Sequence, residues 1–276
     1  MVQRLRLRYA KRGRLRFVSH RDFARALERA LRRAAVPMAY SAGFSPHPRI
    51  SYVGAAPTGV ASEAEYLEIG LAERVDPQRL AAALDAALPA GLDVLDCVEA
   101  RPGGGSLADR IEAGAWRVEL PGVPVETLAD AVRTFLDRDA VPVERLTKDG
   151  RRTLDARGAV VTASVSARPP GGGAGASDGG PDVHCAILDV VVRQMSPAVR
   201  PDDVLAALRV VADLAPPVPP RATRLAQGRL DDNGRLADPL APDRAVAAPG
   251  LLPQVRTEQP GPGEQQAPSL GTTAAR

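Results

Sequence analysis

The amino-acid sequence predicts an α+β protein: two ferredoxin-like domains in tandem, each with the element order βαββαβ, followed by a disordered C-terminal tail. Three observations support this prediction. Apolar and polar residues alternate in several short segments, as in half-buried strands. Capped segments with one apolar stripe lie between them, as in helices that cover a sheet. Residues 75–84 (VDPQRLAAAL) and 199–208 (VRPDDVLAAL) also match at five of ten positions, which suggests an internal repeat.

The first predicted domain covers residues 1–100. Residues 3–9 alternate Arg with Leu and Tyr, which indicates a strand that continues, after a turn, to Phe17. Ser19 is the expected N-cap of a helix, because Asp22 stands three positions later, and the helix should end before Pro37. The other expected elements are strands on both sides of a loop at 43–49, a strand at 64–71, a helix at 76–88 and a strand at 92–98.

The second predicted domain covers residues 114–230, after a glycine-containing linker at 101–113. A Gly/Pro-rich insertion at 167–182 and the tail at 231–276 are expected to be disordered, because neither carries regularly spaced apolar residues. The expected elements are strands at 116–120, 184–193 and 222–230, a hairpin at 143–165, and helices at 125–140 and 201–212.

Composition narrows the class of protein. Hydrophobic residues make up 45% and charged residues 25% of the chain, which is typical of globular proteins. Cys97 and Cys185 are expected to be free thiols in a reducing compartment. We expect a cytoplasmic protein without a membrane partner, because no signal-peptide pattern and no apolar run of about 20 residues is visible. Iron–sulfur, zinc and nucleotide-binding motifs are absent, so no cofactor and no metal site is predicted.

Positive charge is concentrated in residues 1–50, which hold thirteen basic and two acidic residues, whereas the whole chain has a net charge of only +3. The planar guanidinium group of Arg suits phosphate, so this charge predicts a nucleic-acid-binding surface, most simply for RNA. Two alternatives stay open: an ordinary solvated surface, and a surface that docks on an acidic protein. The predicted binding residues are Arg4, Arg6, Arg8, Arg14, Arg16, Arg21, Arg25, Arg29 and Arg49, extended by Lys148, Arg151 and Arg152 of the expected hairpin.

Two histidines are weak catalytic candidates. His20 is expected at the first helical position and His47 stands between two prolines, so together they could act as general acid and base of a metal-independent endoribonuclease. Alternatively, they line a recognition groove with Ser19, Asp22 and Ser45. A third set, Glu63, Glu65 and Glu68, could hold a divalent cation, but strand geometry makes pairing with Arg the simpler expectation.

Several segments resemble one bacterial family. They are residues 15–37 (LRFVSHRDFARALERALRRAAVP), 40–51 (YSAGFSPHPRIS), 59–65 and 148–157 (KDGRRTLDAR). They are similar to the radical-SAM-linked proteins, an uncharacterised family whose members are typically encoded beside, or fused to, a radical SAM protein. The resemblance implies a radical SAM protein encoded nearby as partner, and the missing cluster cysteines imply that this chain is not itself that enzyme. We therefore expect a non-catalytic accessory protein that binds RNA or a ribonucleoprotein for the partner.

Overall fold

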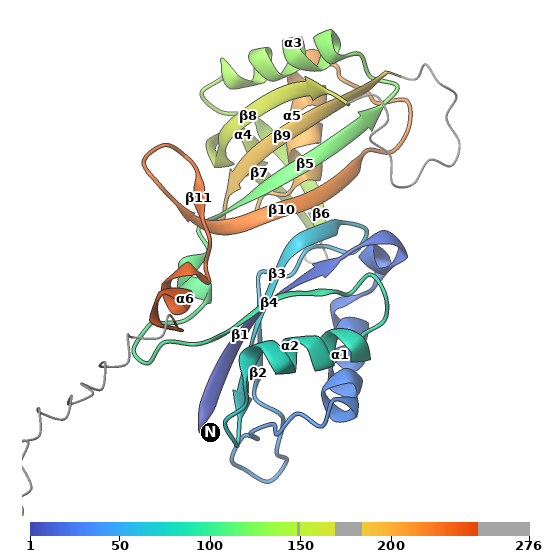
Figure 1. Cartoon of the computed structure of the whole chain (residues 1–276). Helices are drawn as coiled ribbons and strands as arrows, with labels where there is room; N and C mark the ends of the chain where they lie inside the picture. Colours follow the sequence, from blue (N-terminus) through green and yellow to red (C-terminus); the bar gives the residue numbers. More distant parts are fainter. Residues whose placement is uncertain (148–149, 169–183, 248–276) are drawn as a thin grey trace, which may run out of the picture.

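The computed structural model describes residues 1–147, 150–168 and 184–247. Its fold is mixed α+β: the described strands form one nine-stranded sheet and a separate two-stranded hairpin. The path through the main sheet is β4-β1-β3-β10-β5-β9-β8, with β2 paired to β3 and β11 paired to β10. The chain builds one end of this sheet from its first hundred residues and the other end from residues 113–230 (Figure 1). We call these parts the first and second halves.

In the first half, strand alternation and helix caps act as the sequence predicts. Leu5, Leu7 and Tyr9 face the helices in a buried aliphatic core, and the Tyr9 ring stacks on Phe23 with centroids 4.5 Å apart. The Ser19 side chain caps the first helix by accepting the Asp22 N–H at 3.2 Å. The elements are β1 (Gln3–Lys11), η1 (Gly13–Phe17), α1 (His20–Arg33), β2 (Ile50–Val53), β3 (Ala61–Leu71), α2 (Pro77–Ala87) and β4 (Val94–Glu99).

The second half is built around its own core. Trp116, Val118 and Leu120 alternate inward and pack with the helices in a second buried cluster. Its strand order, β10-β5-β9-β8, corresponds to β4-β1-β3-β2 of the first half once the inserted β6–β7 hairpin is set aside. The elements are β5 (Ala113–Pro121), α3 (Val125–Leu136), β6 (Pro142–Thr147), β7 (Gly150–Asp155), α4 (Ala156–Ala159), β8 (Val160–Ala167), β9 (Cys185–Arg193), α5 (Pro201–Ala212) and β10 (Arg221–Leu230).

The two halves meet where β10 pairs in parallel with β3, at Thr223 with Ala61 and Arg224 with Ser62. A bulge in β3 puts two residues opposite one of β1 just beyond this point, between the pairs Tyr9–Glu65 and Lys11–Ser62. The bulge shifts the strand's alternation, so Ser62 and Glu65 both face the helix side of the sheet. There the guanidinium group of Arg224 forms a buried ion pair with Glu65 and donates to Ser62 Oγ at 3.3 Å.

The face of the first half opposite its helices is covered by two segments that the sequence predicts to be irregular. Leu107 and Ile111, from the expected linker around η2 (Ala108–Arg110), pack with Tyr66, Val98 and Leu240 in a third buried cluster. Burial raises the pKa of Tyr66 to about 12. Residues 101–111 are therefore a packed part of the structure and not a free linker.

The prediction of a disordered tail is wrong for residues 231–247, which we call the strap. The strap contains β11 (Leu236–Ala237), which lies at the end of β10, and α6 (Ala241–Ala247), which lies beside the lower half of the sheet in Figure 1. Leu240 and Asp243 anchor it, since they are 0% and 2% exposed. The sequence pattern misses the strap because a single buried Leu and a single buried Asp have no periodicity. Residues 248–276 and most of the insertion at 167–182 lie outside the described residues.

Three other predictions are corrected. Residues 13–17 do not continue β1; Gly13 takes a φ of +54° and the chain enters the 3₁₀ helix η1. The strand expected before the 43–49 loop is reduced to isolated bridges of Met38 with Leu71 and Tyr40 with Pro48. The predicted hairpin at 143–165 is also shorter: β6 and β7 form it alone, and β8 joins the main sheet.

We predict that Glu65→Ala destabilises the protein strongly. The substitution leaves the Arg224 guanidinium group buried without its partner, which typically costs about 3–5 kcal/mol. The free energy of unfolding, measured by urea denaturation, should fall by that amount. The matched control is Asp189→Ala, which removes the half-exposed partner of Arg117 on the other sheet face and should cost about 0–1 kcal/mol. Equal losses in the two variants would contradict a stabilising role of the Arg224–Glu65 ion pair at the junction of the halves.

We also predict that docking of the strap weakens in acid. Burial alone would raise the pKa of Asp243, but hydrogen bonds from Arg110, the Arg101 N–H and Arg6 hold that pKa below the usual 3.8. A carboxyl group whose pKa is lowered by folding stabilises the fold above its usual pKa, and this contribution is lost as the pH falls through the folded-state pKa. The Tm difference between wild type and Asp243→Asn should therefore be largest near neutrality and shrink below about pH 4. A constant difference would exclude this linkage.

Candidate functional site

The clearest candidate site is a pocket of about 230 Å³ on the helix side of the junction between the halves. Both β2 and β10 pair with the same edge of β3, at neighbouring positions. The pocket lies between the loop that follows β2 and the strands β5, β9 and β10. We call it the seam pocket. It is lined by Gly54, Ala55, Pro57, Ala113, Gly114, Trp116, Val192, Arg193, Gln194, Ala198, Val199, Arg200, Arg224 and Gln227.

Trp116 and Arg224 form the floor of the seam pocket. They stand directly opposite each other on β5 and β10, and the guanidinium carbon of Arg224 lies 5.3 Å from the centroid of the indole ring. The ion pair with Glu65 fixes Arg224, whose side chain is 5% exposed. Tertiary contacts thus hold an aromatic ring and a cation in one orientation before any ligand enters.

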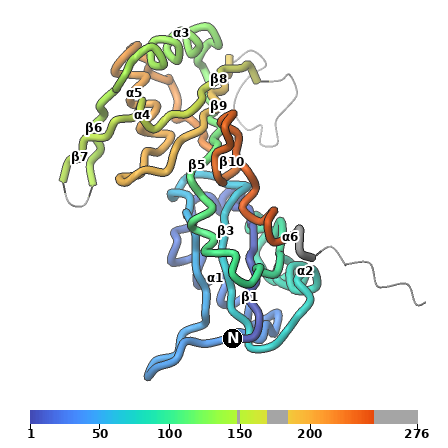
Figure 2. The backbone as a smooth tube through the Cα atoms, turned by 90° about the vertical axis from the view of Figure 1, so that its left-hand side faces the viewer, coloured from blue at the N-terminus to red at the C-terminus, as the bar shows by residue number. Residues whose placement is uncertain are grey.

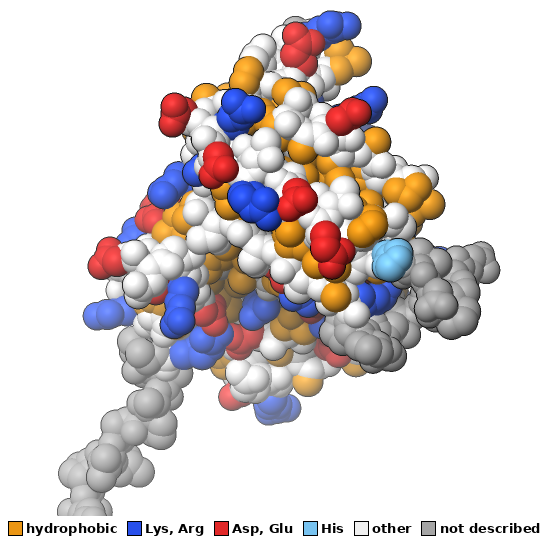
Figure 3. All heavy atoms as spheres, turned by 90° about the horizontal axis from the view of Figure 1, so that it is seen from above, with side chains coloured by type: hydrophobic (Ala, Val, Ile, Leu, Met, Phe, Trp, Pro, Cys, Tyr) orange, Lys and Arg blue, Asp and Glu red, His pale blue; other side chains and the backbone are white. Residues whose placement is uncertain are grey.

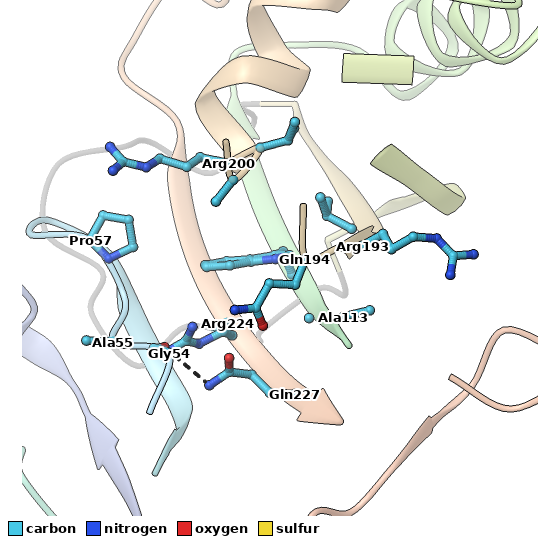
Figure 4. Close-up of a pocket in the computed structure, with 14 residues that line it drawn as sticks. Gly54, Ala55, Pro57, Ala113, Arg193, Gln194, Arg200, Arg224 and Gln227 are labelled. Carbon is cyan, nitrogen blue, oxygen red and sulfur yellow. Dashed lines mark hydrogen bonds between the residues drawn. The ribbon is translucent and has the colours of Figure 1, made fainter. Parts of the chain in front are cut away.

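Two carboxamides give the pocket hydrogen-bonding groups. Gln227 Nε2 donates to Ala64 O at 2.6 Å and to Gly54 O at 3.5 Å, and these bonds tie β10 to the first half. Figure 4 shows Gln194, Gln227 and Arg224 turned toward one another in the middle of the pocket. The Gln194 side chain makes no hydrogen bond among the described residues, so both its donors and its acceptor are available to a ligand.

The seam pocket is electrostatically positive. No Asp or Glu stands among its lining residues, whereas Arg193, Arg200 and Arg224 do. Glu65 neutralises Arg224, but Arg193 and Arg200 are exposed and extend from opposite sides of the pocket (Figure 4). Nearby, burial lowers the pKa of Lys11, Glu65 raises it and Arg224 lowers it further, so the net pKa is lower than usual. The pocket therefore suits a planar polar group that carries negative charge on its flanks.

The structure does not bring the sequence-predicted arginines together on one surface. Arg4, Arg6 and Arg8 point to the sheet face opposite the helices, because Leu5 and Leu7 between them face the core. Arg6 is 0% exposed and pairs with Glu68 at 2.7 Å and with Asp243 at 2.9 Å. Arg8 is half-buried and donates to Glu63 O, and Arg4 is exposed. In this arrangement Arg6 is a buried partner of carboxylates and is not open to solvent as the sequence-based prediction expects.

Of the other predicted first-half arginines, five lie on η1 and α1, whereas the Arg49 side chain lies beside Gly70 on the face opposite the helices. Arg16 stacks its guanidinium carbon 4.6 Å from the Phe17 ring centroid, and the Arg16 carbonyl accepts the Gly59 N–H at 2.8 Å, which joins η1 to the loop beside the seam pocket. Arg49 donates to Tyr40 O at 3.2 Å. The predicted arginines that are exposed on η1 and α1 are Arg14, Arg21, Arg25 and Arg29, and Arg32 and Arg33 of α1 are exposed as well.

Charge elsewhere is mixed. Figure 3, which views the second-half end of the molecule, shows acidic and basic side chains interspersed. On the β6–β7 hairpin, Arg151 pairs with Glu144 at 3.3 Å and Arg152 is exposed. Lys148 lies outside the described residues, so the predicted extension of the cationic surface is described only for the two arginines.

The predicted histidine pair is not assembled. The His20 ring meets the Tyr52 ring edge-on, with centroids 4.8 Å apart. His47 lies in the loop before β2, where its N–H donates to Ser41 Oγ. Five residues of extended chain, roughly 16 Å at about 3.3 Å per residue, separate His47 from Tyr52. This loop projects from the end of the first half (Figure 2). General acid–base partners must reach one substrate group, and these two do not.

The predicted groove residues do not contribute to the seam pocket either. Ser19 and Asp22 are bonded to each other at 2.7 Å in the cap of α1, and Ser45 is exposed in the projecting loop. The three glutamates are paired: Glu63 with Arg12, Glu65 with Arg224 and Glu68 with Arg6. Within the described ranges, no group of three or more His, Cys, Asp or Glu residues is placed to hold a metal ion.

Sequence reasoning missed the seam pocket. Its central ring, Trp116, is the only Trp of the chain and falls in the strand expected at 116–120. Its cation, Arg224, is 159 residues from its partner Glu65, so no local pattern could pair them. The one available signal was an unusual residue type: a lone Trp in a chain with 3% aromatic residues.

Comparison with protein families gives a match over most of the chain. The model of DUF2344, described as an uncharacterized protein conserved in bacteria, matches residues 4–201, which is well over half of the chain. No curated protein matches the sequence. In the part of the chain that the structure describes, no helix is both long and apolar enough to cross a membrane.

Proposed function

The chain belongs to the DUF2344 family, and we propose that this member binds RNA, with one unpaired nucleotide in the seam pocket and flanking phosphates on nearby arginines. One observation carries the proposal: an indole ring, two carboxamides and three guanidinium groups surround one pocket whose lining contains no carboxylate. Proteins recognise unpaired bases by stacking on aromatic rings and by hydrogen bonds to base edges. Arginine side chains at the edges then contact the backbone.

Size favours a single base over a larger ligand. The pocket volume of about 230 Å³ is below the roughly 300–1,000 Å³ of sites that enclose drug-sized ligands. The loop that borders the pocket is tied to η1, where Arg14 and Arg16 continue the positive charge toward α1. A single strand leaving the pocket on this side would meet guanidinium groups first.

We further propose, from the resemblance of the sequence, that the RNA-bound protein serves a radical SAM enzyme as a non-catalytic accessory subunit. The separation of His20 from His47 removes the support for an endoribonuclease. The corresponding strand orders of the halves, and the repeat that places VDPQRLAAAL at α2 and VRPDDVLAAL at α5, support the proposal that the halves are duplicated ferredoxin-like units.

The proposed pocket is tested with the fluorescence of Trp116. Short single-stranded RNA should change this emission on titration, and Arg193→Ala/Arg200→Ala should lower the affinity at least tenfold. Because two phosphate contacts are lost, the slope of log affinity against log salt should become less steep by about 1.4. The matched control is Arg133→Ala/Arg209→Ala, which removes two exposed arginines of α3 and α5 outside the pocket. Equal losses in both double variants would disprove pocket binding.

The α1 arginines give a second prediction. Arg21→Ala/Arg25→Ala/Arg29→Ala should weaken RNA binding by reducing phosphate contacts, while the free protein keeps its unfolding temperature, because these side chains are exposed. Filter binding at several salt concentrations and thermal unfolding measure the two quantities. If RNA affinity is unchanged but a co-purifying protein is lost from the triple variant, α1 docks an acidic protein instead.

A further inference from the structure

The carboxylate of Asp243 is held as a bound anion would be. Its Oδ2 accepts from Arg6 Nη1 at 2.9 Å and from Arg110 Nη1 at 2.6 Å, and its Oδ1 accepts the Arg101 N–H at 3.0 Å. Asp243 is 2% exposed. Two guanidinium groups and one backbone N–H thus converge on one pair of oxygens, which is the donor set that binds phosphate as well as carboxylate.

The strap supplies the anion, while other segments hold the cations in place. Arg6 belongs to β1 and is oriented by Glu68 Oε1 at 2.7 Å and Gly105 O at 2.6 Å. Arg110 donates to Gly104 O at 2.8 Å. Glu68 balances only one of the two positive charges, so the site without Asp243 carries one excess positive charge in a buried position. An uncompensated buried charge is strongly destabilising, so the site is stable only with an anion bound.

The glycine loop at 103–105 is shaped around this site. Gly103 and Gly105 have φ values of +71° and +72°, and a Cβ on Gly104 would lie 2.9 Å from Arg110 Nη2 and 3.0 Å from Arg101 O. The loop, Arg101 and Arg110 also line a neighbouring pocket of about 630 Å³, whose lining includes Asp109 and Asp238 but neither Arg6 nor Asp243.

Apart from the donors to Asp243 and the hydrogen bond from Arg110 Nη1 to Pro239 O at 2.8 Å, few contacts hold the strap. β11 pairs with β10 at two residues, Arg229 with Ala237 and Leu230 with Leu236. Leu240 is its one member of the buried cluster beneath it, and Arg244 pairs with Asp96 and Asp238 at the surface. Short segments with so few buried contacts open locally without unfolding the rest of the protein.

We propose that Arg6, Arg110 and the Arg101 N–H form a phosphate-binding site that Asp243 occupies as an internal competitor. Opening of the strap removes the carboxylate, uncovers Arg6 and leaves the site to a phosphate group. The site lies on the sheet face opposite the seam pocket, so it does not depend on the proposed RNA contact there. Arg4 and Arg8 of β1 flank it on the same face.

The test is rescue of Asp243→Ala by inorganic phosphate. In phosphate-free buffer this variant should melt below wild type, and phosphate should restore its Tm and bind at least tenfold more tightly than to wild type, measured by calorimetry. Sodium chloride at matched ionic strength should not replace phosphate. Asp96→Ala is the control, because it weakens the strap through Arg244 and leaves the Asp243 carboxylate in place; phosphate should stabilise it less than it stabilises Asp243→Ala. No rescue, or equal rescue by chloride, overturns the proposal.

Two further measurements complete the test. If Asp243→Ala does not fold, hydrogen exchange of residues 236–244 in wild type should speed up in the presence of phosphate; unchanged exchange refutes competition. A short oligonucleotide with a 5′-phosphate is compared with free phosphate on Asp243→Ala and on Asp243→Ala/Arg110→Ala. Binding of either probe that disappears in the double variant supports the site and identifies its source of phosphate, whereas binding that survives Arg110→Ala places the ligand elsewhere and overturns it.

Discussion

The buried ion pair of Arg224 with Glu65 is the constraint on which the arrangement of the two halves depends. Only two residue pairs of β3 and β10 join the halves in the sheet, which is too little backbone pairing to define one orientation. Arg224 and Gln227 add side-chain bonds to Glu65, Ser62 and Ala64 across the junction. Buried charges are costly unless fully bonded, and the Ala56 N–H, which donates to Glu65 Oε2 at 3.0 Å, completes the carboxylate's contacts. Because both buried charges must keep all of these hydrogen bonds, the two halves can take very few positions relative to each other.

The seam pocket follows from the same constraint. β10 pairs with β3 only at residues 61 and 62, and β2 takes over the same edge at residues 66–69. Residues 63–65 of β3 have no strand partner on this edge, so their backbone groups need side-chain partners. Gln227 Nε2 donates a hydrogen bond to one of them, Ala64 O. Among the described residues, every buried polar side-chain atom has a hydrogen-bond partner. The polar groups of the pocket therefore stabilise the junction as well as being available to a ligand, which links any binding event to the position of the halves.

The two faces of the first half use arginine in different ways. On β1, arginine alternates with leucine toward a face that the strap and residues 101–111 cover, so Arg6 becomes a buried ion-pair partner. On α1, the arginines extend from a helix whose inner side is filled by Phe23, Leu27 and Leu31, and they stay exposed. Both segments are rich in arginine, yet on one face Arg6 is buried in ion pairs and on the other the arginines are exposed to solvent. Net charge alone does not distinguish them.

The sequence by itself determined the elements. Strand alternation, the Ser19 and Asp76 caps and the apolar stripes are local patterns, and the predicted helix at 201–212 agrees with α5 in both bounds. Only the tertiary structure decided which charged side chains are buried and which distant residues they pair with. Arg6 is separated from Asp243 by 237 residues and Arg224 from Glu65 by 159, so no spacing rule connects them. Periodicity reports which side of an element meets the core; it does not report which distant segment will cover the other side, because that depends on the summed packing of the whole chain.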